Sequence, residues 1–313
     1  MKKATLFTLK LGAFTVMLAS ILLLFKQNGW ITTLFLSTAI QFCIGALVLG
    51  IVMVYLKKYK HAIYYFIASI LLSFQFIGYF FEDDQEIAQF EFNYPKLKIA
   101  QFNVLASNKS KKETIQSIIA SNATILSIQE TNKNWTDSLD KELRHAYPYS
   151  IYFPTERCCY GISMLSKVPL MNADITFHGG VPNIEADIYF GNQLTHVISS
   201  HTPSPISRSN LLARNQHIAD LKKHISKIDS PTIIMGDFNT VPWDDNMIAL
   251  KETSNLVDSR KSYTSTFPSY LGVGGIPIDY ILHSQEIKCT DFKSISIKGS
   301  DHRGIIGEYI INK

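Results

Sequence analysis

Apolar residues follow two different patterns along the chain, and the pattern changes near residue 97. The first 81 residues contain three long apolar stretches, at about 6–25, 31–56 and 62–81. A helix that crosses about 30 Å of hydrocarbon at about 1.5 Å per residue needs about 20 mainly apolar residues. Because each stretch reaches or approaches that length, we expect residues 1–81 to form a membrane region with three transmembrane helices.

The first apolar stretch has a second interpretation, as a secretory signal peptide that is removed from the mature chain. A basic start and an apolar core fit that interpretation. Lys10 lies inside the stretch, but a lysine near a helix end can extend its side chain to the lipid headgroups. Residues 26–29 lead directly into the second stretch without a clear small-residue cleavage site. We therefore expect a membrane anchor.

The lysines of this region predict how the helices would be oriented. They form one group at the start of the chain and another between the second and third stretches: Lys2, Lys3 and Lys10, and Lys57, Lys58 and Lys60. Lysine-rich ends and loops stay on the cytoplasmic side. Three crossings would then place everything after residue 81 outside the cytoplasm. We expect an integral, multi-pass protein of the cell membrane, with the lipid bilayer as a partner and an extracytoplasmic C-terminal domain.

Residues 82–96 are polar and irregular and read as a linker, after which short apolar runs alternate with helical patterns. The expected strands are 97–104, 124–129, 162–165, 185–190, 194–200, 232–235, 278–282, 294–297 and 304–311, and the expected helices are 111–120, 135–146 and 209–225. Ser110 and Glu113 have the spacing of a capping box at the start of the first helix. The alternation predicts one α/β domain over residues 97–313, with helices outside a core of two sheets.

The charges are distributed unevenly between these two regions. Residues 1–81 hold seven lysines, no arginine and no acidic residue, although the whole chain has 30 basic and 26 acidic residues. The remainder therefore carries 23 basic and 26 acidic residues, a net charge of −3. A strongly basic surface for nucleic acid is not evident. Charged residues make up 18% of the chain, below the roughly 25% of soluble domains, which agrees with a membrane region.

The four cysteines do not form a metal-binding pattern. They are Cys43 in the second apolar stretch, the adjacent pair Cys158 and Cys159, and Cys289. No spacing among them resembles a zinc site. An oxidising compartment would let Cys289 pair with one of the adjacent two, but we expect buried free thiols.

Several of the expected strands end in side chains that can bind a hard cation or move a proton. These are Asn103, Glu130, His201, Asp237, Asn239, Asp279, Asp301 and His302. Each signal is weak on its own, because Asp-Phe-Asn can be a turn and His201 can be a loop histidine. Glu130 is harder to explain structurally, since a carboxylate that directly follows a buried run needs a charged or hydrogen-bonding partner to offset the cost of its burial. The order and spacing of the whole set carry the argument.

Seven short motifs contain these residues in a fixed order. They are Phe-Asn at 102–103, Gln-Glu at 129–130, Gly-Ile-Ser-Met-Leu-Ser-Lys at 161–167, His-Thr-Pro at 201–203, Gly-Asp-Phe-Asn at 236–239, Ile-Asp-Tyr-Ile-Leu at 278–282 and Ser-Asp-His at 300–302. This ordered set resembles the endonuclease/exonuclease/phosphatase superfamily, which includes deoxyribonucleases, apurinic-site endonucleases, neutral sphingomyelinases and inositol-polyphosphate 5-phosphatases. The resemblance covers residues 97–313 and does not extend to the apolar N-terminal region.

The resemblance implies a fold and a cofactor. The fold is a four-layered α/β sandwich, in which two packed β-sheets are flanked by helices and the site lies at one edge. Members of the superfamily usually cleave phosphate esters with Mg²⁺ or Mn²⁺. Since Mg²⁺ prefers oxygen ligands, Glu130 is the best candidate ligand, with Asn103 and Asp301 beside it.

The resemblance also implies roles for the remaining residues. His302, oriented by Asp279, would be the general base that activates water. Asp237 and Asn239 would position the attacking water or a second ion, and His201 would donate to the phosphate or to the leaving oxygen. A Ser or Cys nucleophile is not implied.

The sequence predicts a membrane-anchored, divalent-metal-dependent phosphoesterase and leaves its substrate open among nucleic acid, phospholipid and small phosphoesters. The net charge of −3 after residue 81 argues against tight, general binding of DNA. Arg208, Arg214 and Arg303 could nevertheless form a local basic rim. A non-enzymatic alternative is a membrane-tethered binding module with a relic site. An obligate protein partner is not evident from the sequence.

Overall fold

The computed structural model describes residues 11–12, 14–21, 29–81, 94–156 and 159–311. It contains two compact units, each described here by itself. The N-terminal unit comprises residues 1–83 together with 205–208, and the C-terminal unit comprises 84–204 and 209–313. The predicted linker at residues 82–96 lies almost entirely outside the described residues, and the first strand of the C-terminal unit begins at Lys96.

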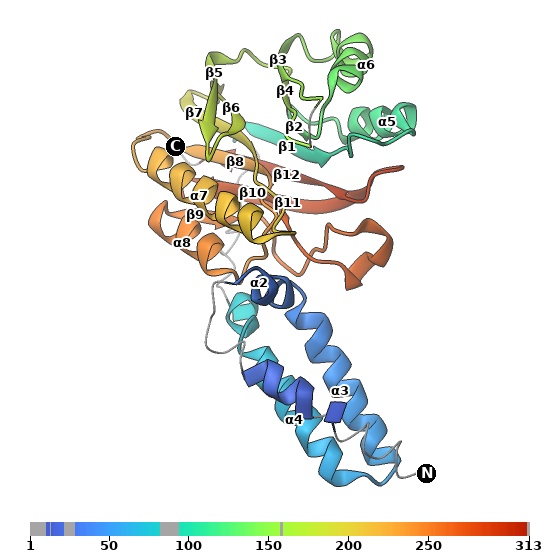
Figure 1. Ribbon diagram of the computed structural model, residues 1–313. Coiled ribbons are helices and arrows are strands. Elements are labelled where there is room, and N and C mark those ends of the chain that lie inside the picture. The colour runs from blue at the N-terminus through green and yellow to red at the C-terminus, as the bar shows by residue number, and fades with distance from the viewer. Residues whose placement is uncertain (1–10, 13, 22–28, 82–93, 157–158, 312–313) are drawn as a thin grey trace. The chain divides into compact units, whose positions relative to one another are not determined.

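The N-terminal unit is helical. Residues 11–12 and 14–21 are helical, followed by α2 (Trp30–Ser37), α3 (Ala39–Tyr55), α4 (Tyr59–Ser73) and the short 3₁₀ helix η1 (Ile77–Phe81). The helices α3 and α4 pack side by side (Figure 1), and the Ser69 hydroxyl donates to the Cys43 carbonyl over 3.1 Å. Near the turn between them, Met53, Ala62 and Tyr65 form a small apolar core.

The expectation of three transmembrane helices is not met in the part of this unit that the structure describes. No single helix there is long and apolar enough to cross a membrane; only α2 and α3 together satisfy length and composition, and they are bent by 65°. The bend falls at Thr38, which leaves helical geometry at φ −108°. The third stretch divides because α4 ends at Ser73 and only a 3₁₀ turn follows. Both ends of the first stretch lie outside the described residues.

The C-terminal unit contains two six-stranded mixed sheets. The first sheet has the order β11 (Ile287–Ser296), β12 (Arg303–Ile311), β1 (Lys96–Asn103), β2 (Ile125–Gln129), β4 (Ile162–Ser166) and β3 (Tyr149–Phe153). The second has the order β5 (Met171–His178), β6 (Val181–Phe190), β7 (Gln193–His201), β8 (Thr232–Asp237), β10 (Asp279–Ser284) and β9 (Leu256–Asp258). In each sheet one central pair is parallel, β1 with β2 and β7 with β8, and the other pairs are antiparallel.

Helices cover the outer faces of the two sheets, as Figure 1 shows. They are α5 (Lys111–Ser121), α6 (Lys133–Leu143), α7 (Arg208–Ile225) and α8 (Asp245–Thr253), with the 3₁₀ segment η2 (Ser269–Gly274) before β10. Trp135 and Leu139 of α6 pack with Leu126 of the first sheet, whereas Ile218 and Leu221 of α7 pack on the second.

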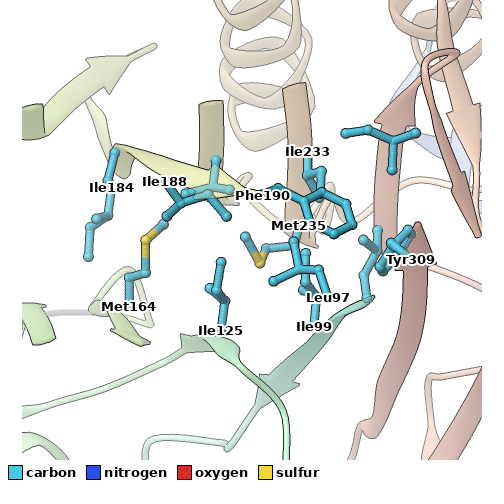
Figure 2. Close-up of a cluster of buried hydrophobic side chains, with 14 of the residues drawn as sticks. Leu97, Ile99, Ile125, Met164, Ile184, Ile188, Phe190, Ile233, Met235 and Tyr309 are labelled. Atoms are coloured by element: carbon cyan, nitrogen blue, oxygen red, sulfur yellow. The ribbon is translucent and has the colours of Figure 1, made fainter. Parts of the chain in front are cut away.

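Side chains from both sheets meet in a third apolar layer. Ile99 and Ile125 of the first sheet pack there with Ile184, Ile233 and Met235 of the second (Figure 2). Alternate residues of each strand therefore face this inner core, and the residues between them face the helices. Two sheets flanked by helices confirm the predicted α/β sandwich.

Each of the nine strands expected from apolar runs overlaps an observed strand, although the expected strand 294–297 covers only the end of β11, and all three expected helices of this unit are confirmed. The sequence analysis missed β3, β5, β9 and α8. The predicted capping box is wrong, because the Ser110 side chain makes no cap hydrogen bond and its N–H instead donates to Asn108 Oδ1 over 2.8 Å. Cys43, Cys159 and Cys289 are free thiols, and Cys158 lies outside the described residues.

Candidate active site

The site lies where strands of both sheets end at the same edge of the sandwich. The last residue of β1, Asn103, is in register with Gln129 at the end of β2. In the second sheet, Asp237 at the end of β8 pairs with His201 at the end of β7 and with Asp279 at the start of β10. Side chains at the ends of such strands are held by a rigid scaffold and face a common space.

Asp237, Asp279 and His302 form the centre of the site. The Nδ1 atom of His302 lies 2.9 Å from Asp279 Oδ2, and its Nε2 lies 3.6 Å from Asp237 Oδ2. All three are buried, and their ligand atoms lie within 4.8 Å of one another. A histidine with one nitrogen held by a carboxylate has a fixed ring orientation and presents the other nitrogen to a substrate or water. The predicted pairing of Asp279 with His302 is therefore present.

Asn103 connects this centre to the predicted metal ligand. Its Nδ2 donates to Glu130 Oε1 and to Asp237 Oδ2, both over 3.0 Å, and its Oδ1 accepts from the Leu105 N–H over 3.1 Å. The Oδ1 atom, which would bind a metal ion, accepts one N–H and keeps a second lone pair. The role of Asn103 as a metal ligand therefore stays a prediction, and its Nδ2 links two carboxylates.

Glu130 sits in an unusual backbone conformation immediately after β2. Its φ angle is +63°, a region that residues other than glycine seldom occupy. Its Oε2 accepts the Ala106 N–H over 3.1 Å, so the two carboxylate oxygens accept from different partners. A left-handed residue directly after a strand turns the carboxylate toward the strand ends and costs about 1–3 kcal/mol of backbone strain.

Gly236 and Asn239 shape the turn that follows β8. Gly236 has φ +155°, and a Cβ there would lie 1.8 Å from the Ser200 carbonyl oxygen, so only glycine fits. Asn239 has φ +48°; its N–H donates to Asp237 Oδ1 over 2.9 Å, and its Nδ2 donates to the Thr202 carbonyl over 2.9 Å. The turn therefore fixes Asp237 by a local hydrogen bond and ties it to the end of β7.

His201 lies on the other side of Asp237. Its Nε2 is 3.6 Å from Asp237 Oδ2, so one carboxylate oxygen faces two imidazoles. The ring of Tyr160 packs edge-on against His201, with 5.9 Å between centroids. The structure thus brings all the predicted site residues of β1, β2, β7, β8 and β10 together with the Asp301–His302 pair.

The electrostatics of the centre follow from burial and from the close spacing of its charged groups. Burial alone would lower the pKa of His302, but the negative charges of Asp279 and Asp237 outweigh it and raise that pKa to about 10. Burial, reinforced by Asp279, raises the pKa of Asp237 to about 6. Burial lowers the pKa of His201. The two shifts have a common origin, because the two carboxylates and the imidazole lie close together away from solvent.

The donor set fits a hard divalent cation. Asp301 Oδ1 is buried and has no hydrogen-bond partner among the described residues. Burial and the neighbouring charge of Glu130 both raise the pKa of Asp301. The Asp301 and Glu130 carboxylates repel each other, and one Asp301 oxygen has no partner among the described residues. A bound cation that prefers oxygen ligands, such as Mg²⁺ or Mn²⁺, would stabilise this arrangement.

The structure adds positioning residues that sequence reasoning did not assign. Gln101 Nε2 donates to Asp279 Oδ1 over 2.8 Å and to Gln129 Oε1 over 2.7 Å. The Thr266 hydroxyl accepts from the Asp279 N–H over 3.2 Å, and the ring of Phe267 lies 4.9 Å from that of His302. A signal for Gln101 was present, because it is a polar residue at an inward-facing position of β1, two residues before Asn103.

The expected basic rim is wrong for Arg214. This side chain is only 1% exposed. Its Nη1 donates to the Asn239 carbonyl over 3.2 Å, and its Nη2 is 3.1 Å from Asp244 Oδ2. Arg214 therefore supports the turn after β8 from beneath and is not available to a substrate.

Comparisons with known proteins agree with this geometry. The sequence model of the Endonuclease/Exonuclease/phosphatase family matches residues 100–302. No curated protein sequence is significantly similar to the chain.

Solved structures have the same fold. An endonuclease/exonuclease/phosphatase from Beutenbergia cavernae DSM 12333 has a TM-score of 0.56 at 14% identity, over 70% of this chain and 72% of that chain. D. rerio TDP2, complexed with single strand DNA product, has a TM-score of 0.58 at 16% identity, over 70% and 99%. The human Nocturnin catalytic domain, with bound sulfate anion, has a TM-score of 0.56 at 17% identity, over 70% and 96%.

At such low identities the solved structures establish the fold alone. The family match covers well over half of the chain and contains every strand-end residue of the site. The chain belongs to the endonuclease/exonuclease/phosphatase family, whose members are hydrolases that act on phosphoester bonds.

Proposed function

We propose that this protein is a divalent-cation-dependent phosphoesterase. The observation that supports it most is the convergence of Asp237, Asp279 and His302 beside the carboxylates of Glu130 and Asp301, of which Asp301 has a buried oxygen without a partner. Glu130 and Asp301 would hold the cation. When bound, Mg²⁺ or Mn²⁺ offsets the negative charge that develops on the phosphate oxygens.

The protein side chains divide the remaining work. Asp237 and His302 form a coupled pair that holds and transfers the proton of the attacking water, so the apparent pKa values belong to the pair. Asp279 fixes the His302 ring through Nδ1, and Asn239 fixes Asp237. His201, buried and with a lowered pKa, would donate a hydrogen bond to the phosphate or to the leaving oxygen.

Removal of the cation tests this proposal. Excess chelator should abolish hydrolysis of a phosphodiester by the full chain, and Mg²⁺ or Mn²⁺ in excess over the chelator should restore it. Full activity in chelator would exclude a metal-dependent mechanism. A protein that binds phosphate esters but hydrolyses none of them, even with Mg²⁺ or Mn²⁺, would favour the alternative of a binding module.

An exposed apolar segment next to the site favours an amphipathic substrate. In η2, Tyr270 and Val273 are 81% and 90% exposed. The segment begins at Ser269, whose N–H donates to the Asp301 carbonyl over 2.7 Å. Apolar side chains this exposed indicate contact with a partner or lipid. We therefore propose a phospholipid-type phosphoester in preference to a polynucleotide.

A pair of matched variants tests the substrate class. Tyr270→Ser should lower turnover of a phospholipid in vesicles but not of a soluble phosphodiester, and Tyr189→Ser, which removes another exposed tyrosine, should change neither. Efficient, steeply salt-dependent cleavage of DNA without turnover of phospholipid would reverse this assignment, because polynucleotide binding releases counterions.

We also propose that the N-terminal unit associates with a membrane and that the C-terminal unit is extracytoplasmic. Apolar side chains are exposed along α3 and α4, including Ile44 at 56%, Ile51 at 56% and Ile70 at 57%. Water is an unfavourable environment for such helices, and lipid is a favourable one. A reporter fused after residue 90 should be extracytoplasmic, and one inserted at residues 57–60 should be cytoplasmic; the reverse pattern would contradict the proposal.

A further inference from the structure

A second group of histidines and carboxylates lies between the second sheet and α7. On β6, Ile184, Ala186 and Ile188 face the apolar core between the sheets. Glu185 and Asp187 alternate with them and therefore face the helix side. A buried or half-buried carboxylate at such a position needs a charged or hydrogen-bonding partner.

Two histidines meet the Glu185 carboxylate. Its Oε2 lies 2.6 Å from His224 Nε2, near the C-terminal end of α7, and 3.3 Å from His196 Nε2 on β7. One ligand atom from each of the three residues lies within 4.8 Å of the other two. Glu185 is 7% exposed, while the His224 side chain is 31% exposed, so the group is buried at one end and reachable from solvent at the other.

A second layer of contacts fixes the orientation of His196. Its Nδ1 lies 2.7 Å from Asp187 Oδ1, and Asp187 Oδ2 in turn accepts from Asn172 Nδ2 over 2.8 Å. Because Asp187 holds Nδ1, the other nitrogen, Nε2, faces Glu185 and is the one that would bind a metal ion. Metal-binding histidines are held in this way, and the carboxylate increases their basicity.

His178 of β5 supplies an independent observation. It is 7% exposed, and its Nε2 is buried without a hydrogen-bond partner among the described residues. The centroid of its ring lies 5.3 Å from the centroid of the His224 ring. A buried imidazole nitrogen without a partner is unfavourable unless a further group occupies the space beside the cluster.

We propose that Glu185, His196 and His224 form a binding site for a transition-metal ion of the Zn²⁺ type. Two imidazole nitrogens and one carboxylate oxygen form a common zinc ligand set, and the fourth position is filled by water or by a further ligand. The nitrogen-rich donors distinguish this site from the oxygen-rich active site, which suits Mg²⁺.

The cluster is separate from the active site. His196 precedes His201 by five residues of β7, which corresponds to about 17 Å at about 3.3 Å per residue. An odd separation along a strand also places their side chains on opposite faces of the sheet. Zinc at this position would fasten the end of α7 to β6 and β7 and would not take part in the phosphoester chemistry.

Zinc binding to the full chain tests the proposal. The test uses a full-length double variant, Glu130→Gln with His302→Asn, as the background, because these changes weaken cation binding at the active site. Competition with a chromogenic chelator should show one Zn²⁺ per chain, and Co²⁺ should give the visible absorption of a tetrahedral complex. Asp187→Asn should weaken zinc binding by about 10–100-fold, as loss of an orienting partner does, and Glu185→Gln and His224→Ala should weaken it further.

The control is His145→Ala, which removes an exposed histidine outside the cluster and should leave zinc affinity unchanged. Zinc should also raise the urea midpoint of the background protein, a readout that needs no cluster variant to fold. Zinc binding that Glu185→Gln and His224→Ala leave unaltered, or a background chain that zinc neither binds nor stabilises, would show that protons alone hold the cluster together and would overturn the proposal.

Discussion

The C-terminal unit holds two clusters of imidazoles and carboxylates that use the same residue types in opposite ways. At the strand ends, Asp237, Asp279 and His302 are accompanied by two further carboxylates, so negative charge is in excess. The second cluster, called here the cluster beneath α7, consists of Glu185, His196 and His224. Its central carboxylate, Glu185, lies between the two imidazoles, so the cluster has two possible nitrogen ligands for a metal ion and one carboxylate.

The pKa shifts of the acidic residues also differ between the two clusters. At the strand ends, burial raises the pKa of the acid Asp237. Beneath α7, burial would raise the pKa of Glu185, but hydrogen bonds from His196 and His224 outweigh it and lower that pKa. The comparison teaches that clusters of the same residue types can differ in charge balance and exposure, and the different roles proposed for the two clusters rest on these differences.

The largest expected effect is on catalysis at the strand ends. His302→Asn removes the imidazole that faces Asp237, and we expect kcat to fall by about 10²–10⁴-fold, the usual contribution of a positioned acid or base. KM should change little, because this variant retains the proposed contacts of the phosphate, namely the cation at Glu130 and Asp301 and the His201 side chain. Steady-state kinetics with His145→Asn as the control measures this. Wild-type kcat in His302→Asn would remove this cluster from the chemistry.

The next effect concerns Arg214 of α7, which donates to the turn that follows Asp237. Arg214→Met leaves the buried carboxylate of Asp244 without its charged partner, and breaking a buried ion pair of this kind costs about 3–5 kcal/mol of unfolding free energy. Urea denaturation of the full chain measures the loss. Arg144→Met breaks an exposed pair with Asp140 and should leave the unfolding midpoint nearly unchanged. Equal, small effects of both variants would mean that Arg214 does not support the turn after β8.

A third prediction separates the metals of the two clusters. Glu130→Gln should raise the Mg²⁺ concentration for half-maximal activity by at least about tenfold, because a neutral amide is a weaker ligand for a hard cation. The same variant should retain the zinc affinity of the cluster beneath α7. Glu142→Gln, an exposed change, is the control for Mg²⁺. A Glu130→Gln variant with unchanged Mg²⁺ dependence and lost zinc binding would reverse the assignment.

The smallest expected effect is the pH dependence of stability beneath α7. Burial lowers the pKa of His196, but its hydrogen bonds to Glu185 and Asp187 outweigh burial and raise it above 6.5. Protonated His196 therefore stabilises the fold below that value, and this stability is lost as pH rises through the raised pKa. Urea denaturation in chelator should show wild type losing stability over this window and His196→Gln losing less. A steeper loss in His196→Gln would contradict the sign.

The sequence predicted the central strands of the fold and missed those at its margins. The missed strands β3, β5 and β9 all lie at sheet edges. An edge strand buries little of its length and therefore lacks a continuous apolar run; β5 alternates apolar and polar residues, and only one of them, His178, is buried. The central strands β2 and β8 are buried along their whole length and are rich in apolar residues, which the pattern analysis detects.

The candidate site was predictable where its residues directly follow buried strands. Asn103, Glu130 and Asp237 stand out because each interrupts an apolar run. The contact of Gln101 with Asp279 joins residues 178 positions apart, and no local pattern contains it. The cluster of Glu185, His196 and His224 escaped for the same reason, since a strand pair and a helix must pack before the three residues meet.

The left-handed backbone at Glu130 has a consequence for how this protein can evolve. Glycine is the residue that accommodates φ +63° without strain, so Glu130→Gly would relieve the backbone while removing the carboxylate. Selection for thermal stability alone is therefore expected to favour the loss of an active-site residue at this position, as it would at Asn239 with φ +48°. Laboratory evolution of a more stable variant should therefore select for turnover as well, because at these two positions the change that relieves the backbone also removes a residue of the candidate site.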